Sequence, residues 1–206
     1  MSLRTAAKRI LNAVALVVTA PVALSCAVAD VLGIGHAGYT FWAQTLSLLP
    51  GVPGRFLRRG FYRWMLRHCA EDVTIEFGAV LSRRGAELGS GVYIGAYALI
   101  GWVRIGDRTL VGSRVSVLSG TRQHQLSPDG RWLGTDPANL QRISLGADTW
   151  VGEGAIIMAD VGTRCMVSAG GVVSTAVPDG VMVAGNPARF VRRVDPAPLD
   201  HEPATS

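Results

Sequence analysis

The chain has 206 residues and a formal net charge of +5, and 49% of its residues are hydrophobic. This length allows one principal domain with an appendage. The three cysteines, Cys26, Cys69 and Cys165, show neither paired spacing nor a metal-binding motif. They therefore argue against a disulfide scaffold or a zinc finger and favour a reducing compartment.

The chain begins with a strongly apolar segment. Residues 10–29 carry no charged side chain and follow Arg4, Lys8 and Arg9, a pattern typical of a membrane segment or a signal peptide. The tripeptide at residues 27–29, Ala-Val-Ala, would suit a signal peptidase. A core helix that packs on the rest of the chain is the third interpretation.

A second apolar stretch, residues 38–49, precedes a basic segment, residues 55–67. We expect the basic segment to form an amphipathic helix whose arginines meet anionic head groups while apolar side chains enter the membrane interface. Those apolar side chains are Phe56, Leu57, Phe61, Trp64 and Met65. Because positive charge flanks the apolar region on both sides, we expect a helical hairpin that enters one leaflet and returns. Pro21 is expected to break the apolar run, and Pro50 and Pro53 to end the second arm.

Residues 1–72 are thus predicted to be a hydrophobic and amphipathic helical region that associates with the cytoplasmic face of a membrane. A basic protein also raises the possibility of nucleic-acid binding. Here the basic cluster is interleaved with aromatic residues beside an apolar segment, which fits a membrane surface better than a nucleic acid.

The rest of the chain carries a repeat with a period of six residues. In residues 88–117 and 145–173 an aliphatic residue, usually followed by glycine, returns at this interval, apart from one five-residue step in the first block and one four-residue step in the second. Four positions after most of these aliphatics a second inward position holds Val92, Ala98, Thr109, Val115, Thr149, Ala155, Cys165 or Gly171. Two inward positions per unit indicate one short strand per unit, with glycine at the corner and a shared aliphatic core between stacked coils. A β-sandwich would need turns about every eight to twelve residues.

This pattern, over about residues 73–193, resembles the hexapeptide-repeat acyltransferases. The resemblance implies an all-β domain, a left-handed parallel β-helix that assembles as a homotrimer. The handedness comes from the resemblance alone, because crossovers between parallel strands are generally right-handed. Residues 194–206, with three prolines and no aromatic residue, are predicted to be a disordered tail.

The period breaks at residues 121–142, which we expect to project from a corner of the solenoid as a loop. The loop holds His124, the only histidine between Asp72 and the tail. Acyl transfer from a thioester to an alcohol needs a base for the hydroxyl proton, and an imidazole with its ordinary pKa of about 6.5 suits that role. By the resemblance His124 is the general base; the alternative is a solvated loop histidine. One histidine cannot supply the three ligands of the zinc enzymes that share this repeat, so no metal is expected.

The end of the repeat carries a second part of the resemblance. Residues 185–189, Gly-Asn-Pro-Ala-Arg, match the family's terminal signature. In the family acetyl-CoA lies in the groove between subunits, which implies that Ala169 and Gly170 meet its pantetheine arm and Arg189 a phosphate. The usual Thr-Lys is Ser-Thr at residues 174–175, which removes one expected phosphate contact. A solvated cap is the alternative role for the arginines.

Glu153 and Asp160 are candidates to orient the imidazole, although a surface carboxylate at a β-helix corner is the commoner case. Trp132 either lines the acceptor pocket or anchors the loop. We therefore predict a CoA-dependent acyltransferase, an O-acetyltransferase that moves an acetyl group from acetyl-CoA to a hydroxyl of a lipid-linked sugar or surface-glycan intermediate. The alternatives are transfer to a soluble amino sugar or amino acid, and a non-catalytic β-helix scaffold.

Overall fold

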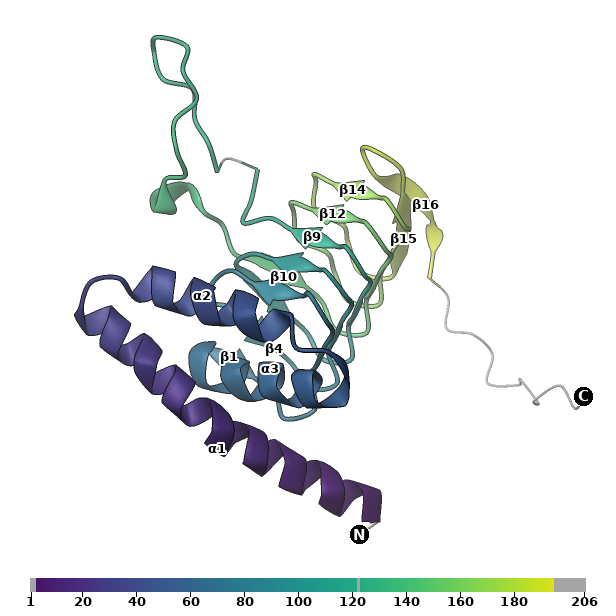
Figure 1. The fold of residues 1–206 in the computed structure, drawn as a ribbon. Helices are drawn as coiled ribbons and strands as arrows, with labels where there is room; N and C mark the ends of the chain where they lie inside the picture. The colour runs from purple at the N-terminus through teal and green to yellow at the C-terminus, as the bar shows by residue number, and fades with distance from the viewer. Residues whose placement is uncertain (1–2, 122, 195–206) are drawn as a thin grey trace, which may run out of the picture.

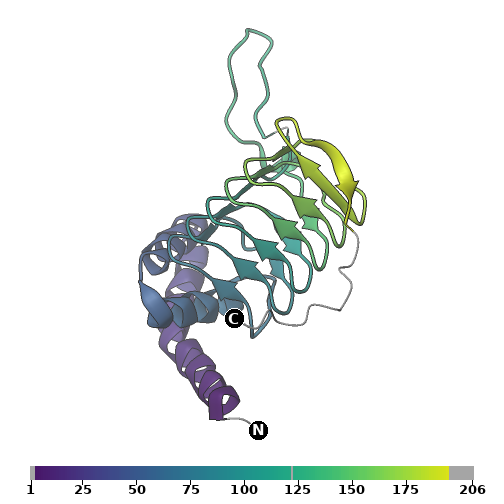
Figure 2. The same ribbon diagram turned by 90° about the vertical axis from the view of Figure 1, so that its right-hand side faces the viewer.

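A computed structural model describes residues 3–121 and 123–194, in which helices precede a parallel β-helix of about six coils (Figures 1 and 2). The predicted fold class is confirmed, and the solenoid is a left-handed parallel β-helix. Each coil contributes to three faces in turn, so that the coils stack as a three-sided prism.

The three faces of the prism are three sheets. The four-stranded sheet has the order β1 (His68–Cys69), β4 (Glu87–Leu88), β7 (Val103–Ile105), β10 (Ile143–Leu145). The seven-stranded sheet has the order β16 (Arg189–Arg193), β15 (Val181–Ala184), β13 (Met166–Val167), β11 (Trp150–Val151), β8 (Leu110–Val111), β5 (Tyr93–Ile94), β2 (Thr74–Ile75). The five-stranded sheet has the order β14 (Val172–Val173), β12 (Ile156–Ile157), β9 (Ser116–Val117), β6 (Leu99–Ile100), β3 (Val80–Leu81). Among the strands of the described residues in these three sheets, β15 and β16 form the one antiparallel pair.

In-register stacking builds the core of the prism. Val151, for example, pairs with Val111 in the coil below and Val167 in the coil above, and all three are fully buried. Two buried hydroxyls interrupt the aliphatic column. Each finds an acceptor: Thr109 donates to the carbonyl of Gly146 and Thr149 to that of Gly162. The repeat therefore buries these threonines without an unsatisfied donor.

Close stacking at the corners explains why glycine usually follows the aliphatic residue. At Gly146 an added Cβ would overlap the backbone nitrogen of Thr163 in the next coil. Backbone cannot retreat as a flexible side chain can, so this corner accepts only glycine.

Helices α1 (Leu3–Val31), α2 (Gly35–Ser47) and α3 (Gly51–Met65) lie at the N-terminal end of the prism (Figure 1). Helices α2 and α3 contact the first coil, and α1 packs against both of them. The expectation that Pro21 breaks the apolar run is wrong, because Pro21 lies inside the continuous α1. Helix α2 is moreover held on the prism, where the Tyr39 hydroxyl donates to the Leu81 carbonyl at 2.7 Å.

Helix α3 differs from the expected membrane-facing helix. Phe61 is fully buried, Arg58 is 1% exposed and Arg59 is 8% exposed, so these side chains do not face a lipid surface. The strands of the first coil are edge strands, and their outward carbonyls need donors. Arg58 donates to Ile75 at 2.9 Å and Arg59 to Val73 at 2.9 Å. The two arginines therefore cap the open end of the solenoid.

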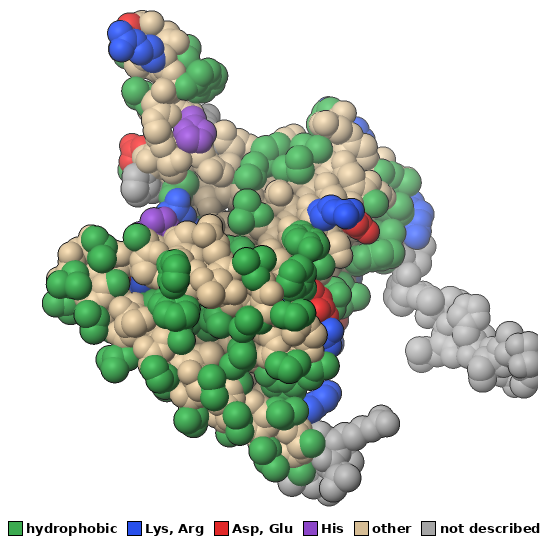
Figure 3. All heavy atoms as spheres, viewed as in Figure 1, with side chains coloured by type: hydrophobic (Ala, Val, Ile, Leu, Met, Phe, Trp, Pro, Cys, Tyr) green, Lys and Arg blue, Asp and Glu red, His purple; other side chains and the backbone are tan. Residues whose placement is uncertain are grey.

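Helix α1 has two different faces. Its inner face carries the small buried residues Ala15, Thr19, Cys26 and Ala29. Its outer face carries exposed apolar residues at intervals of three, four or seven: Ile10, Val14, Val17, Leu24, Val28 and Val31. Figure 3 shows hydrophobic side chains spread over this end of the molecule. Over residues 6–31 the helix is long and apolar enough to cross a membrane, by length and composition alone.

Candidate active site

The inserted loop leaves the prism after β9 and returns at β10, at the corner between the five-stranded and four-stranded sheets (Figure 1). The Gln141 N–H donates to the Ser119 carbonyl at 3.0 Å and closes the base of the loop. Farther out the chain forms a small hairpin, with an antiparallel bridge between Leu126 and Trp132. These contacts hold the segment that carries His124 away from the prism.

The imidazole of His124 is oriented by a backbone carbonyl. Its Nδ1 lies 3.1 Å from the carbonyl oxygen of Leu133, on the opposite strand of the hairpin. A carbonyl oxygen can only accept, so in the neutral ring this hydrogen bond requires the proton on Nδ1. Nε2 is then left with its lone pair, which is the state that a general base needs.

His124 lines a cavity of about 390 Å³ at this corner of the prism. The other lining residues are Leu118, Gly120, Thr121, Gln123, Trp132 and Met158. Trp132 therefore lines the same cavity as the histidine, and it also pairs with Leu126 within the loop. Sequence reasoning missed Met158, although it directly follows β12 at the same corner from which the loop departs one coil below.

The two carboxylates suggested as partners of the imidazole are engaged elsewhere. Glu153 pairs with Arg114 at 3.1 Å, and Asp160 accepts a hydrogen bond from the Ser144 N–H at 2.7 Å. Neither carboxylate contacts His124 among the described residues of the chain, which fits the alternative of a surface carboxylate. A backbone carbonyl fills that role, and no residue type in the sequence signals it. Among residues 3–121 and 123–194, no group of three or more His, Cys, Asp and Glu side chains could hold a metal ion.

Ala169 and Gly170 form an exposed corner of the last complete coil, between the seven-stranded and five-stranded sheets. The Gly170 N–H donates to the Glu153 carbonyl at 2.8 Å. Within the described part of the chain, neither the N–H nor the carbonyl of Ala169 has a hydrogen-bond partner. The coil above, which would supply the donor to that carbonyl, ends in the β15–β16 hairpin instead. An unpaired amide pair at an exposed corner can bind an extended ligand that itself carries amides.

Arg189 begins β16, at the C-terminal end of the prism. The segment before it is fixed on β14, because the Ala188 N–H donates to the Val172 carbonyl at 2.8 Å. The Arg189 side chain is exposed, and its guanidinium contacts only the neighbouring Ala188 carbonyl among the described residues, at 3.2 Å. It can therefore bind an anion from solvent.

The structure separates the predicted site residues within one chain. His124 projects from one corner of the prism, whereas Ala169 and Gly170 lie at another corner, across the five-stranded sheet. Arg189 lies on the far edge of the seven-stranded sheet.

No family model matches the chain. In sequence it is similar to the galactoside O-acetyltransferase of Escherichia coli (strain K12), with 29% identity over 97 residues, which are 45% of each chain. The chain spans less than two thirds of the length of the curated relatives it matches. These relatives are acetyltransferases of the hexapeptide-repeat type.

Solved structures share the fold. One is a maltose O-acetyltransferase from Clostridium difficile 630, with a TM-score of 0.63 and 17% identity, covering 77% of this chain and 86% of that one. Another is a galactoside acetyltransferase in complex with coenzyme A, with a TM-score of 0.56 and 21% identity, covering 78% and 83%. At these identities the likeness concerns the fold.

Proposed function

We propose that this protein is a CoA-dependent O-acetyltransferase in which His124 is the general base. The observation that carries the proposal is the hydrogen bond between Nδ1 of His124 and the Leu133 carbonyl, which leaves Nε2 basic beside a cavity. The sequence relatives, which are acetyltransferases, support the same reaction class.

The chemistry would proceed without a covalent enzyme intermediate. Nε2 of His124 takes the proton from the acceptor hydroxyl while the oxygen forms a bond to the thioester carbonyl carbon. A backbone N–H stabilises the oxyanion of the resulting tetrahedral intermediate. The imidazolium then returns the proton to the CoA sulfur as the C–S bond breaks. The products are the acetyl ester and CoA, and His124 is again neutral.

Acetyl-CoA is the proposed donor, and the groups around the last coil fit it. The free N–H and carbonyl of Ala169 match the amides of the pantetheine arm, and the absence of a side chain at Gly170 leaves room for it. Arg189 can pair with a phosphate. The structure of a galactoside acetyltransferase in complex with coenzyme A supports this choice of donor.

A homotrimer would bring the separated groups together, with His124 of one chain facing the Ala169 corner of the next. Outward residues of two faces support such contacts. The seven-stranded sheet exposes Leu110 and Trp150, and the five-stranded sheet exposes Leu99 and Ile156. The four-stranded sheet instead places charged residues such as Arg104 on its outer surface.

The proposed acceptor is a lipid-linked sugar or another surface-glycan intermediate at the cytoplasmic face of a membrane. The apolar outer face of α1 supports this assignment, because a row of exposed aliphatic residues on a surface helix is costly in water. A specific observation favours a second candidate. The relatives named above are a galactoside and a maltose O-acetyltransferase, which makes a soluble sugar an alternative acceptor.

The test uses the purified full-length protein with acetyl-CoA and two sets of acceptors, soluble sugars and lipid-linked sugars in vesicles. Release of the CoA thiol is followed together with the mass of the acceptor. His124→Ala should lower the rate by about 10²- to 10⁴-fold. His68→Ala, which removes an exposed histidine on β1, is the matched control. Equal rates for the two variants would contradict the assignment of His124 as the base. If no CoA is released with either set of acceptors, the proposal that the protein is an enzyme fails.

A further inference from the structure

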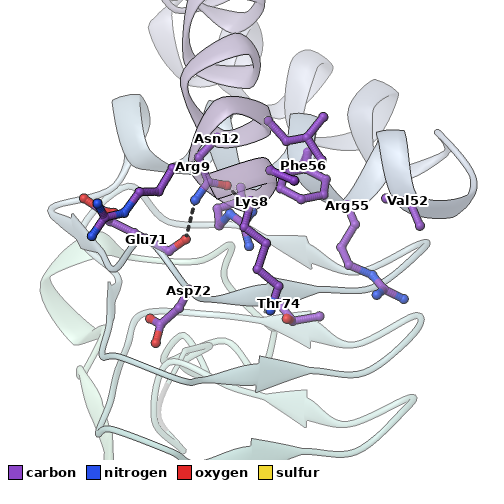
Figure 4. Close-up of a pocket in the computed structure, with 12 residues that line it drawn as sticks. Lys8, Arg9, Asn12, Val52, Arg55, Phe56, Glu71, Asp72 and Thr74 are labelled. Carbon is purple, nitrogen blue, oxygen red and sulfur yellow. Dashed lines mark hydrogen bonds between the residues drawn. The ribbon is translucent and has the colours of Figure 1, made fainter. Parts of the chain in front are cut away.

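One cavity lies far from the proposed acyl-transfer site, at the N-terminal end of the prism. It has a volume of about 560 Å³ and lies between the N-terminal part of α1, the start of α3 and the first coil (Figure 4). Its lining residues are Ala7, Lys8, Arg9, Leu11, Asn12, Val52, Arg55, Phe56, Arg59, Glu71, Asp72 and Thr74. The functional assignment above uses none of them.

The polar part of this cavity is cationic, with four basic side chains against two carboxylates. Lys8 extends from α1 across the cavity toward Thr74 (Figure 4). Its ammonium has no hydrogen bond or ion pair among the described residues. Arg55 pairs with Glu76 at 2.7 Å, but its Nε is buried and has no partner. The cavity therefore offers a free positive charge and an unsatisfied donor, both suited to an anion.

Arg59 fixes the inner wall of the cavity. It donates to the Val73 carbonyl at 2.9 Å and to the side-chain oxygen of Asn12. Asn12 in turn donates to the Glu71 carbonyl at 3.2 Å, as the dashed line in Figure 4 shows. This chain of hydrogen bonds ties α1 to α3 and to the first coil. The cationic wall is thus a built part of the fold.

The other part of the lining is apolar, and it belongs to the apolar end of the molecule. Leu11 and Val52 line the cavity and are 44% and 56% exposed, and Phe56 is half-buried. Leu11 directly follows Ile10, the first residue of the exposed aliphatic row on α1. Inorganic phosphate would use the cations but not this apolar wall. A ligand that uses both is an amphiphile with an anionic head.

We propose that this cavity binds the phosphate headgroup of an anionic phospholipid, whose acyl chains leave past Leu11 and Val52 into the bilayer. The proposal rests on the membrane association proposed above and names the lipid class and the residues that select it. Lys8 and Arg55 hold the phosphate, and the row on α1 lies in the interface. The site would then fix the height and rotation of the prism over the membrane.

The test is co-sedimentation of the full-length protein with vesicles of phosphatidylcholine alone and of phosphatidylcholine mixed with phosphatidylglycerol. The wild-type protein should partition more strongly to the anionic vesicles, and added inorganic phosphate should not reverse this preference. Lys8→Gln and Arg55→Gln should each reduce the preference about fivefold, with unchanged binding to neutral vesicles. The matched control is Arg67→Gln, which removes an exposed charge at the same end of the molecule but outside the cavity.

A second variant separates a built site from general surface charge. Ala7→Trp fills the cavity without changing any charge, and it should reduce the preference for anionic vesicles as the charge variants do. A preference that survives Ala7→Trp, or that falls equally in Arg67→Gln, overturns the proposal. CoA release with soluble sugars is measured in parallel. Loss of lipid selectivity with normal CoA release would therefore not be confused with failure of the proposed enzyme.

Discussion

Nε of Arg58 donates a hydrogen bond to the carbonyl oxygen of Ile75 across 2.9 Å, and this bond joins the middle of α3 to the first coil. The same guanidinium donates through Nη1 to Leu46 at 3.2 Å and to Leu49 at 2.7 Å. Burial lowers the pKa of Arg58, but the side chain stays charged at neutral pH because an arginine starts from a very high value. One buried cation therefore donates hydrogen bonds to the end of α2, to the turn before α3 and to a strand edge.

Arg58→Met should destabilise the protein strongly, because it removes donors from several buried carbonyls at once. Each carbonyl left unpaired costs about 1 to 3 kcal/mol, so a loss of at least about 3 kcal/mol is expected. Chemical denaturation followed by circular dichroism measures the loss. Arg67→Met, at an exposed position, should change the stability little. Similar midpoints for the two variants would show that the Arg58 bonds do not hold the cap in place.

The tautomer of His124 can be measured directly. The bond to the Leu133 carbonyl predicts a neutral ring protonated on Nδ1 and unprotonated on Nε2. In ¹⁵N-labelled protein above neutral pH, the Nε2 resonance should have the shift of an unprotonated ring nitrogen. The His124→Gln spectrum assigns the signal by its disappearance. A proton on Nε2 would contradict the proposed base, since that nitrogen could not then accept one.

The ion pair between Arg108 and Asp148 predicts a dependence of stability on pH. Hydrogen bonds from Arg108, at 2.6 and 2.7 Å, hold the pKa of Asp148 below its ordinary range. A carboxylate with a lowered pKa adds stability above its ordinary pKa of about 3.9, and this contribution is lost as the pH falls through the lower folded value. In Arg108→Gln the pKa of Asp148 should rise toward the ordinary value, as measured by NMR titration.

Arg114→Gln is the matched control for that titration, because Arg114 has the same left-handed backbone conformation and pairs with Glu153 instead. It should leave the Asp148 titration unchanged. Stabilities of wild type and Arg108→Gln should differ above about pH 4 and converge in more acidic solution. A constant difference down to the lowest pH would mean that the ion pair is not its source.

The cysteines report whether α1 stays docked. Cys26 is fully buried on the inner face of α1. Cys69 lies on β1, and burial raises the pKa of its thiol to about 12. Since the thiolate is the reactive form, both should resist alkylation at pH 8. The extent of alkylation of each cysteine is measured by peptide mapping after brief treatment with iodoacetamide, with and without vesicles. Ala27→Cys, one residue away on an exposed position, should be modified quickly.

Rapid modification of Cys26 only in the presence of vesicles would show that α1 leaves the prism when it meets a membrane. Protection in both conditions is expected if the helix lies flat on the surface with its inner face still packed.

Much of the prism could be predicted from the sequence because each of its contacts repeats. Val111, Val151 and Val167 hold the same position in successive units, so the period that places one places them all. The end of the prism could not be predicted in this way. Arg58 and Arg59 belong to a basic amphipathic pattern that normally indicates an exposed face, and their carbonyl partners carry no sequence signal.

The candidate site, too, could be predicted from the sequence only in part. The break in the period located the loop that holds His124, but its partner proved to be a backbone carbonyl rather than Glu153 or Asp160. A backbone group is invisible in the residue types, since every residue has one. The roles of Ala169, Gly170 and Arg189 stay predictions, because the three lie apart from His124 in a single chain.

The arginine cap has a practical consequence for anyone who wishes to shorten this protein. Removing α2 and α3 with α1 would leave Val73, Ile75 and Leu81 on a bare strand edge, and such an edge is a template for end-to-end polymerisation. A cut after α1 keeps the cap and removes the apolar row. A soluble form should therefore begin in the turn before α2. If shorter versions aggregate, the cause would be the uncovered strand edge and not the loss of a membrane anchor.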